Sequence, residues 1–211
     1  MSPHSQIPVI AIIGGIGSGK SAVANWVLNI RSTTVINADE IGHQVLEFPE
    51  MKQQIRAEFG DSVFDENGVV DRSELGNLVF GNSEKSQGRK NKLETIVHPV
   101  IRKEIISQIE LAGNSGQYEF ILLDAAVLLE SGWHEICDAV VFVDVPEEVR
   151  LQRVQQTRGW SKQKFQDREN SQLSLVDKRN AANVIIDNSG SLEEAGEQLL
   201  KALPDICKSS S

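Results

Sequence analysis

The sequence predicts an α/β protein with a three-layer, open parallel sheet. Five short runs rich in valine and isoleucine alternate with stretches in which apolar residues recur at helical spacing. Strands that alternate with helices pair in parallel and connect through right-handed crossovers, which places helices on both faces of the sheet. The length of 211 residues suits a single domain of this kind and leaves little room for a second core.

The composition excludes several classes of protein. Hydrophobic residues make up 40% of the chain and charged residues 24%, as in globular proteins. No stretch approaches the roughly 18 apolar residues of a membrane span, and the two cysteines fit no metal spacing or disulfide framework. The net charge of −9 argues against nucleic-acid binding. We therefore expect a cytoplasmic protein with neither membrane nor nucleic-acid partners, and a monomer is compatible with the sequence.

The elements can be placed in order along the chain. After the first strand, apolar residues from Val23 to Ile30 recur at the spacing of an amphipathic helix. Near the C-terminus, Ser191 and Glu194 form a capping box that begins a helix with an apolar stripe. The expected strands, all apolar runs typical of buried parallel strands, are residues 9–13, 34–37, 120–124, 139–144 and 184–186.

A long insertion separates the second strand from the third. The gap of about 80 residues is too long for a plain crossover helix. Helical patterns fill it over residues 39–48, 51–59 and 84–111. The residue before a proline is biased away from helical angles, so the last of these helices should end at His98-Pro99 and another should begin there. Insertions at the carboxyl ends of strands border the ligand crevice of an open α/β sheet.

The strongest motif follows the first strand. The segment Gly14-x-x-x-x-Gly19-Lys20-Ser21 matches the full phosphate-loop pattern, in which glycines let successive N–H groups point into one concavity. Lys20 should reach the β- and γ-phosphates of a nucleotide, and the Ser21 hydroxyl should ligate Mg²⁺. An ordinary glycine-rich turn is the alternative, but the strand before it and the helix after it favour nucleotide binding. The expected binding residues are Gly15, Ile16, Gly17, Ser18, Gly19, Lys20 and Ser21.

A basic segment indicates which kind of nucleotide-binding protein this is. Residues 147–179 hold eight lysines and arginines against five acidic residues, although the chain as a whole is acidic. A local basic stretch in an acidic protein suggests a small anionic ligand. The chain lacks the Asn-Lys-x-Asp segment of GTPases and the Leu-Ser-Gly-Gly-Gln signature of transporter ATPases. Of the classes of phosphate-loop protein considered, a small-molecule kinase is the one left. Such a kinase has an insert for the acceptor and a lid that closes over ATP.

The chain resembles the dephospho-coenzyme A kinases over residues 9–203. Besides the phosphate loop, the matching landmarks are Asn37-Ala38-Asp39, His98-Pro99-Val100-Ile101-Arg102, Leu128-Leu129-Glu130-Ser131-Gly132-Trp133, Arg168-x-x-x-Gln172 and Val184-Ile185-Ile186-Asp187-Asn188-Ser189-Gly190. The resemblance implies a fold of the P-loop kinase type. It also implies that the protein uses ATP and Mg²⁺ to phosphorylate the ribose 3′-hydroxyl of dephospho-CoA, the last step of coenzyme A synthesis. The implied parts are a core (7–40, 115–148 and 172–204), an acceptor-binding insert (41–114) and a lid (149–171).

The resemblance also assigns candidate catalytic and metal-binding residues. Asp39 matches the second acid of the family's Asp-Ala-Asp, where the chemistry needs an acceptor for the 3′-hydroxyl proton, and Asn37 replaces the first acid. A helix N-cap is the alternative role for Asp39. Asp124 closes an apolar strand and fits a Mg²⁺ position, with a strand-end cap as the alternative. Asp144 is a weaker candidate for the metal because it lies beside Pro146.

The lid contributes arginines. Arg158 would neutralise charge on the transferring phosphoryl group, and Arg168 would bind substrate phosphates, because guanidinium groups match phosphate oxygens. Many relatives place the first of these arginines one residue earlier. Arg150 and Arg153 lie one turn apart on the predicted helix that precedes Arg158. A solvated, salt-bridged helix face is the alternative for all four arginines.

The remaining candidates concern the adenine and the acceptor. Asn188 resembles the loop that borders the adenine, with an ordinary Asn-Ser-Gly turn as the alternative. His98, Arg102 and Glu130 match positions near the acceptor, although the proline and the aromatic residue that usually accompany the glutamate are missing. Two other functions stay open. One is a kinase of another small acceptor, such as a nucleoside monophosphate or a sugar, and the other is an ATP-binding switch protein without an acceptor.

Overall fold

The computed structural model describes residues 4–80 and 83–209. The chain forms two compact units. The first unit joins the segments before Asp39 and after Ile105, and the second unit is Asp39–Ile105. The first unit contains the sheet and the phosphate loop, so it holds most of the residues considered below.

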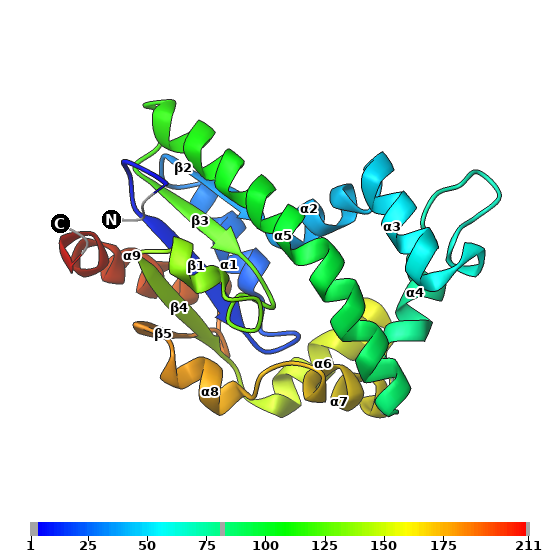
Figure 1. Cartoon of the computed structure of the whole chain (residues 1–211). Coiled ribbons are helices and arrows are strands. Elements are labelled where there is room, and N and C mark those ends of the chain that lie inside the picture. The colour runs from blue at the N-terminus through cyan, green and yellow to red at the C-terminus, as the bar shows by residue number, and fades with distance from the viewer. Residues whose placement is uncertain (1–3, 81–82, 210–211) are drawn as a thin grey trace. The chain divides into compact units, whose positions relative to one another are not determined.

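A five-stranded parallel sheet in the order β2-β3-β1-β4-β5 forms the centre of the first unit (Figure 1). Its strands are β1 (Val9–Gly14), β2 (Thr33–Asn37), β3 (Phe120–Asp124), β4 (Ala139–Asp144) and β5 (Val184–Asp187). These bounds confirm the predicted strands to within one residue at each end. From β1 the chain builds β2 and β3 on one side and then crosses to β4 and β5 on the other. Ligands bind at the carboxyl ends of the strands where the order reverses in this way.

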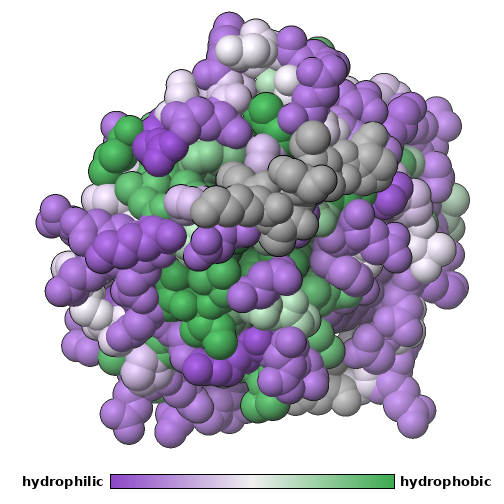
Figure 2. Space-filling model, turned by 90° about the vertical axis from the view of Figure 1, so that its left-hand side faces the viewer, coloured by the Kyte–Doolittle hydropathy of each residue, from purple (hydrophilic) through white to green (hydrophobic). Residues whose placement is uncertain are grey.

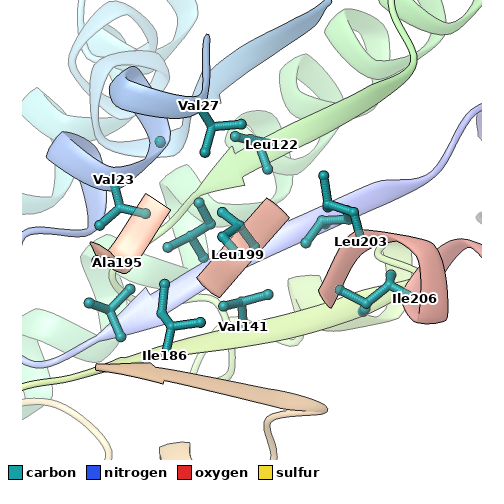
Figure 3. Packing of buried hydrophobic residues seen from close by; sticks show 14 of the residues in the cluster. Val23, Val27, Leu122, Val141, Ile186, Ala195, Leu199, Leu203 and Ile206 are labelled. Carbon is teal, nitrogen blue, oxygen red and sulfur yellow. The ribbon is translucent and has the colours of Figure 1, made fainter. Parts of the chain in front are cut away.

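Helices cover both faces of the sheet, as predicted. The helices of the first unit are α1 (Lys20–Leu28), α6 (Glu147–Arg158), α7 (Lys162–Asn170), α8 (Leu175–Asn180) and α9 (Leu192–Ser209), with the short turn η2 (Trp133–Ile136). Side chains of α1 and α9 interlock with one face of the sheet, where Val27, Leu122 and Leu199 point toward one another (Figure 3). Alternate strand residues such as Ala11 and Leu123 are also fully buried, so the other face is covered as well.

The capping box predicted for α9 is confirmed. The amide of Glu194 donates to Ser191 Oγ at 3.2 Å, and the amide of Ser191 donates to Glu194 Oε2 at 3.1 Å. This reciprocal pair satisfies two N–H groups at the start of the helix. The helix therefore begins directly after the segment 187–190, which keeps that segment short and places it at the carboxyl end of β5.

The second unit is helical, and one of its predicted features is wrong. Its helices are α2 (Ala38–Val45), α3 (Pro49–Phe59), η1 (Asp61–Val63), α4 (Arg72–Val79) and α5 (Glu84–Asn114), of which α5 continues into the first unit. The sequence predicted a break at Pro99, but α5 runs through it. A proline removes one helical hydrogen bond to the carbonyl four residues earlier. Here both Pro99 and Thr95 are exposed, so water can bond that carbonyl, while Val97 and Ile101 stay buried on the other face.

Apolar side chains are also found at the surface. Figure 2 shows one face of the molecule, on which a hydrophobic area is bordered by hydrophilic side chains. The exposed large apolar residues include Leu111, Val176 and Ile185. Single exposed residues of this kind are normal in folded proteins. Among the described helices, none combines the length and the hydrophobicity that crossing a membrane requires.

The contact between α1 and α9 gives a prediction for Gly196. A Cβ at this position would lie 2.0 Å from Cε3 of Trp26. Alanine gains up to about 1 kcal/mol of helix propensity, but displacing a rigid indole from a packed interface costs about 1–3 kcal/mol. We expect Gly196→Ala to lower the free energy of unfolding by about 1 kcal/mol, measured by chemical denaturation.

A matched control is Gly88→Ala in α5. A Cβ at Gly88 would meet nothing within 4 Å, so this substitution should stabilise the protein through propensity alone. A Gly196→Ala protein that is as stable as the Gly88→Ala protein would contradict the predicted clash with Trp26.

Candidate active site

The phosphate loop, defined as residues 14–21, runs from the end of β1 into α1. The amide of Ser18 donates to the carbonyl oxygen of Gly15 at 3.1 Å, which closes a tight turn. Gly19 is the N-cap of α1 with φ of 84°, in the left-handed region that favours glycine. A Cβ there would also lie 2.5 Å from Nδ2 of Asn188. Both the backbone and this close neighbour therefore require glycine.

Three side chains from distant parts of the sequence hold carbonyl oxygens of the phosphate loop. Asn188, which follows β5 and is buried, donates from Nδ2 to the oxygen of Ser18 at 2.7 Å. Arg153 in α6 donates to the same oxygen at 3.5 Å and to the carbonyl oxygen of Asn188 at 2.8 Å. Arg150 donates from Nη1 to the oxygen of Ile16 at 3.2 Å. The loop is therefore fixed from several directions, by contacts that the sequence pattern did not reveal.

The phosphate loop has the properties of an anion site. Lys20 is the first residue of α1, so its charge adds to the positive end of the helix. The hydroxyl of Ser18 is fully buried, and within the described part of the chain it has no hydrogen-bond partner. An unsatisfied buried hydroxyl costs about 1–3 kcal/mol. A phosphate oxygen at the loop could accept this hydrogen bond, so the loop fits a phosphorylated ligand.

The two residues predicted to bind Mg²⁺ lie together. Asp124 at the end of β3 is buried, and its Oδ2 accepts a hydrogen bond from the Ser21 hydroxyl. A buried carboxylate is costly unless it is paired or coordinates a metal. Mg²⁺ prefers oxygen ligands and usually binds one or two carboxylates together with substrate phosphates. The hydroxyl and the carboxylate therefore fit a Mg²⁺ position beside the phosphate loop.

Asp39 lies two residues after the end of β2 and begins the second unit. Its carboxylate is exposed, in the first turn of α2. The helix begins at Ala38, so Asp39 is inside the helix and not at its N-cap. Asn37, which stands where the family has its first acid, pairs in register with Asp124 of β3. Asn37, the last residue of β2, therefore lies on the strand that adjoins the one that carries Asp124.

The two lid arginines among the candidates differ in their surroundings. Arg158 is the last residue of α6 and is exposed, and its guanidinium lies 5.3 Å from the centre of the Trp160 ring. Lys164 of α7 lies 5.2 Å from the same ring. Arg168 in α7 is half-buried, and burial lowers the pKa of its guanidinium from the ordinary value. Arginine stays protonated at neutral pH, so both groups remain cations.

The acceptor candidates of the second unit lie on α5. His98 and Arg102 are one turn apart, and Lys90 and Glu94 precede them at the same spacing. Burial lowers the pKa of His98 below 6.5, an effect that Glu94 opposes and Lys90 supports. His98 is therefore neutral at pH 7 and can exchange hydrogen bonds with a ligand, whereas Arg102 supplies positive charge.

Glu130 is occupied by other residues of the first unit. Its Oε1 accepts the amide of Leu173 at 2.8 Å and lies 3.0 Å from Nζ of Lys178. Lys178 is 1% exposed and also donates to the oxygen of Ala126 and to Oε1 of Gln172, both at 3.0 Å. The geometry thus gives Glu130 a structural role, joining the turn after β3 to the loop before α8.

This arrangement gives a prediction for Glu130→Ala. The substitution would leave the buried ammonium of Lys178 without its carboxylate, and breaking a buried pair on one side costs about 3–5 kcal/mol. We expect the free energy of unfolding to fall by about 3 kcal/mol in denaturant titrations, because Lys178 keeps its other two acceptors.

The control is the double variant Glu130→Ala/Lys178→Met, which removes both charges and should recover most of the loss. If Glu130→Ala kept full stability and raised the KM for an acceptor instead, Glu130 would belong to the binding site and the structural role would be wrong.

The chain is similar to known proteins in its sequence and in its fold. The family model for dephospho-CoA kinase matches residues 8–194. A dephospho-CoA kinase from Bacillus licheniformis is 39% identical over 197 residues, covering 92% of this chain and 94% of that protein. The crystal structure of TT1252 from Thermus thermophilus has a TM-score of 0.79 at 30% identity, over 94% of this chain and 97% of that one. A dephospho-CoA kinase structure from Campylobacter jejuni shares the fold, with a TM-score of 0.58 at 24% identity over 95% and 97% of the two chains.

Proposed function

The chain belongs to the dephospho-CoA kinase family, as its sequence motifs predicted, and we propose on that premise that it transfers the γ-phosphoryl group of ATP to the ribose 3′-hydroxyl of dephospho-CoA. The observation that carries the proposal is the pairing of a complete phosphate loop with the Ser21–Asp124 contact at its side. This is the combination that phosphoryl transfer from a Mg²⁺-bound nucleotide needs. A cytoplasmic location is part of the proposal, because ATP is made and used there.

The phosphate loop would bind the ATP phosphates. Its backbone N–H groups and the positive end of α1 attract the anion, and Lys20 adds a point charge near the β- and γ-phosphates. Ser21 and Asp124 would hold Mg²⁺, which when bound neutralises charge on the phosphate oxygens. Asn188 acts here through the backbone, because its side-chain amide holds the oxygen of Ser18. The segment that follows it would border the adenine.

Asp39 would act on the nucleophile. Its carboxylate accepts a hydrogen bond from the 3′-hydroxyl, orients that oxygen toward the γ-phosphorus and takes the proton as the new P–O bond forms. The P–O bond to the β-phosphate breaks, and ADP leaves with the electron pair. Arg158 would neutralise the charge on the transferring group, since it is an exposed cation at the end of α6.

The acceptor carries phosphate groups that need cationic partners. We assign this role to Arg102 of the insert (41–114) and to Arg168 of the lid (149–171), with His98 as a neutral hydrogen-bonding group. Dephospho-CoA is a small-molecule partner, and the proposal needs no other. The oligomeric state does not enter it, since every residue assigned a role belongs to the same chain.

Two other functions make different predictions. A kinase of a nucleoside monophosphate or a sugar would share the phosphate loop and the lid, so the fold alone does not separate it from the proposed enzyme. The family match over residues 8–194 favours dephospho-CoA as the acceptor. An ATP-binding switch protein would hydrolyse ATP slowly, at a rate that no acceptor changes.

A panel of acceptors tests the function. Release of ADP should rise above the acceptor-free rate with dephospho-CoA and not with nucleoside monophosphates or sugars, and mass spectrometry should find coenzyme A as the product. Lys20→Ala should lower turnover on the order of 100-fold or more, the cost of removing one group that stabilises transition-state charge. Its melting temperature should stay unchanged. Equal stimulation by another acceptor, or no stimulation by any, would overturn the proposal.

Substitution of Asp39 tests the catalytic assignment. Asp39→Asn keeps the shape of the side chain but cannot accept the proton, so kcat should fall about 100-fold. The dissociation constant for ATP, measured by calorimetry, should change less than about twofold, because the substitution leaves the groups that bind phosphate in place.

Glu40→Gln is the matched control, because Glu40 is also an exposed acid in the first turn of α2. It has the same relation to the helix dipole, so it reports any effect of the dipole alone. An Asp39→Asn enzyme that is as active as the Glu40→Gln enzyme would reduce Asp39 to a helix-stabilising acid.

A further inference from the structure

Arg150 is a buried cation that the proposed reaction does not use. It lies in the first turn of α6 and is 2% exposed. Its Nε donates to the carbonyl oxygen of Val145, the residue after β4, at 3.1 Å. Its Nη1 donates to the carbonyl oxygen of Ile16 in the phosphate loop at 3.2 Å. One guanidinium therefore ties the start of the lid to the turn that would hold the phosphates.

The same guanidinium also binds α7. Its Nη1 pairs with Oε1 of Glu169, and its Nη2 lies 3.4 Å from Oε2 of the same carboxylate. The side chain of Glu169 is 22% exposed. The ring of Phe165, one turn earlier on α7, lies 5.4 Å from the Arg150 Cζ. Arg150 is thus held between the phosphate loop and one face of α7.

The energetics favour a positioning role over a stabilising one. Taking an arginine and a carboxylate out of water costs about as much as their attraction returns, so a buried pair is weak evidence of stability. Two-pronged guanidinium–carboxylate pairs do fix geometry strongly. A Cβ at Gly15 would lie 2.7 Å from Nη1 of Arg150, so the loop backbone packs directly on the guanidinium. A displacement of α7 would therefore reach the loop through rigid contacts.

We propose that Arg150 and Glu169 form a latch that positions α7 against the phosphate loop and so raises the affinity for nucleotide. The latch also places Arg168, the neighbour of Glu169 in α7. Arg150 is a positioning residue here, because it acts through the backbone of the loop and through α7. The proposal rests on the proposed function only in that the ligand of the loop is ATP.

The first test removes both charges together. In Arg150→Met/Glu169→Met no charge is left unpaired, so the melting temperature should stay close to that of the original protein. The dissociation constant for ATP, measured by calorimetry, should rise about tenfold, because this is the equivalent of losing one charge-assisted hydrogen bond. If the double variant bound ATP as tightly as the original protein, the pair would be merely structural and the latch would be refuted.

A second test follows the position of α7 directly. In Glu169→Gln, amide hydrogen exchange should become faster across α7 while β1 and β4 keep their protection. Asp167→Asn is the matched control, because Asp167 lies on the same helix and accepts a hydrogen bond from Gln163 of α7 itself. Unchanged exchange in α7 of Glu169→Gln would overturn the latch, even if the double variant failed to fold.

These measurements separate the latch from the proposed function. ATP affinity and hydrogen exchange are read without any acceptor. A protein that fails to phosphorylate dephospho-CoA but loses ATP affinity in the double variant would contradict the proposed function and support the latch. Full phosphorylation of dephospho-CoA, with ATP affinity and α7 exchange unchanged by the substitutions, would do the opposite.

Discussion

The site depends on how the carbonyl oxygens of the phosphate loop are held. Arg150 donates a hydrogen bond to the carbonyl oxygen of Ile16. Asn188 and Arg153 both donate to the carbonyl oxygen of Ser18. A carbonyl oxygen that accepts a hydrogen bond from a side chain is held in place. It therefore cannot turn toward a bound anion and repel it. The N–H groups of the loop and the positive end of α1 then set the potential that a phosphate meets. The side chains that make this possible come from the segments after β4 and β5, far from the motif in sequence.

The sheet explains why these segments meet. In a parallel sheet all carboxyl ends lie on one edge, and the order β2-β3-β1-β4-β5 puts β1 in the middle of that edge. The loop after β1 is therefore flanked by Asp124 from β3 on one side and by the start of α6 after β4 on the other. The oxygens that we propose for Mg²⁺ and the side chains that hold the phosphate loop thus reach the loop from opposite sides. The Asp124 carboxylate is thereby kept apart from the guanidinium groups that would neutralise it.

Local patterns predicted much of the fold and part of the site. The phosphate loop is a contiguous motif, and Asp124 could be found because an acid ends an otherwise apolar strand. The break at Pro99 was predicted wrongly, because the residue pattern does not show that the affected carbonyl faces water. The roles of Arg150 and Glu130 were out of reach for another reason. Arg150 and Ile16 are 134 residues apart, and Glu130 and Lys178 lie in separate segments on either side of β4, so no spacing rule applies to either pair.

The charge of the basic segment, residues 147–179, also could not be interpreted correctly from the sequence alone. At least three of its eight cations bind carboxylates inside the first unit: Arg150 with Glu169, Lys178 with Glu130, and Arg179 with Asp144. Two of these cations are almost fully buried, so they shape the fold around the site and do not attract ligands from solvent. The net charge of the segment therefore overstates what it offers to an anion. The backbone of the phosphate loop must therefore supply a large share of the attraction for an anionic ligand. For this reason the rigidity of the loop, and the side chains that hold it, govern the affinity for nucleotide.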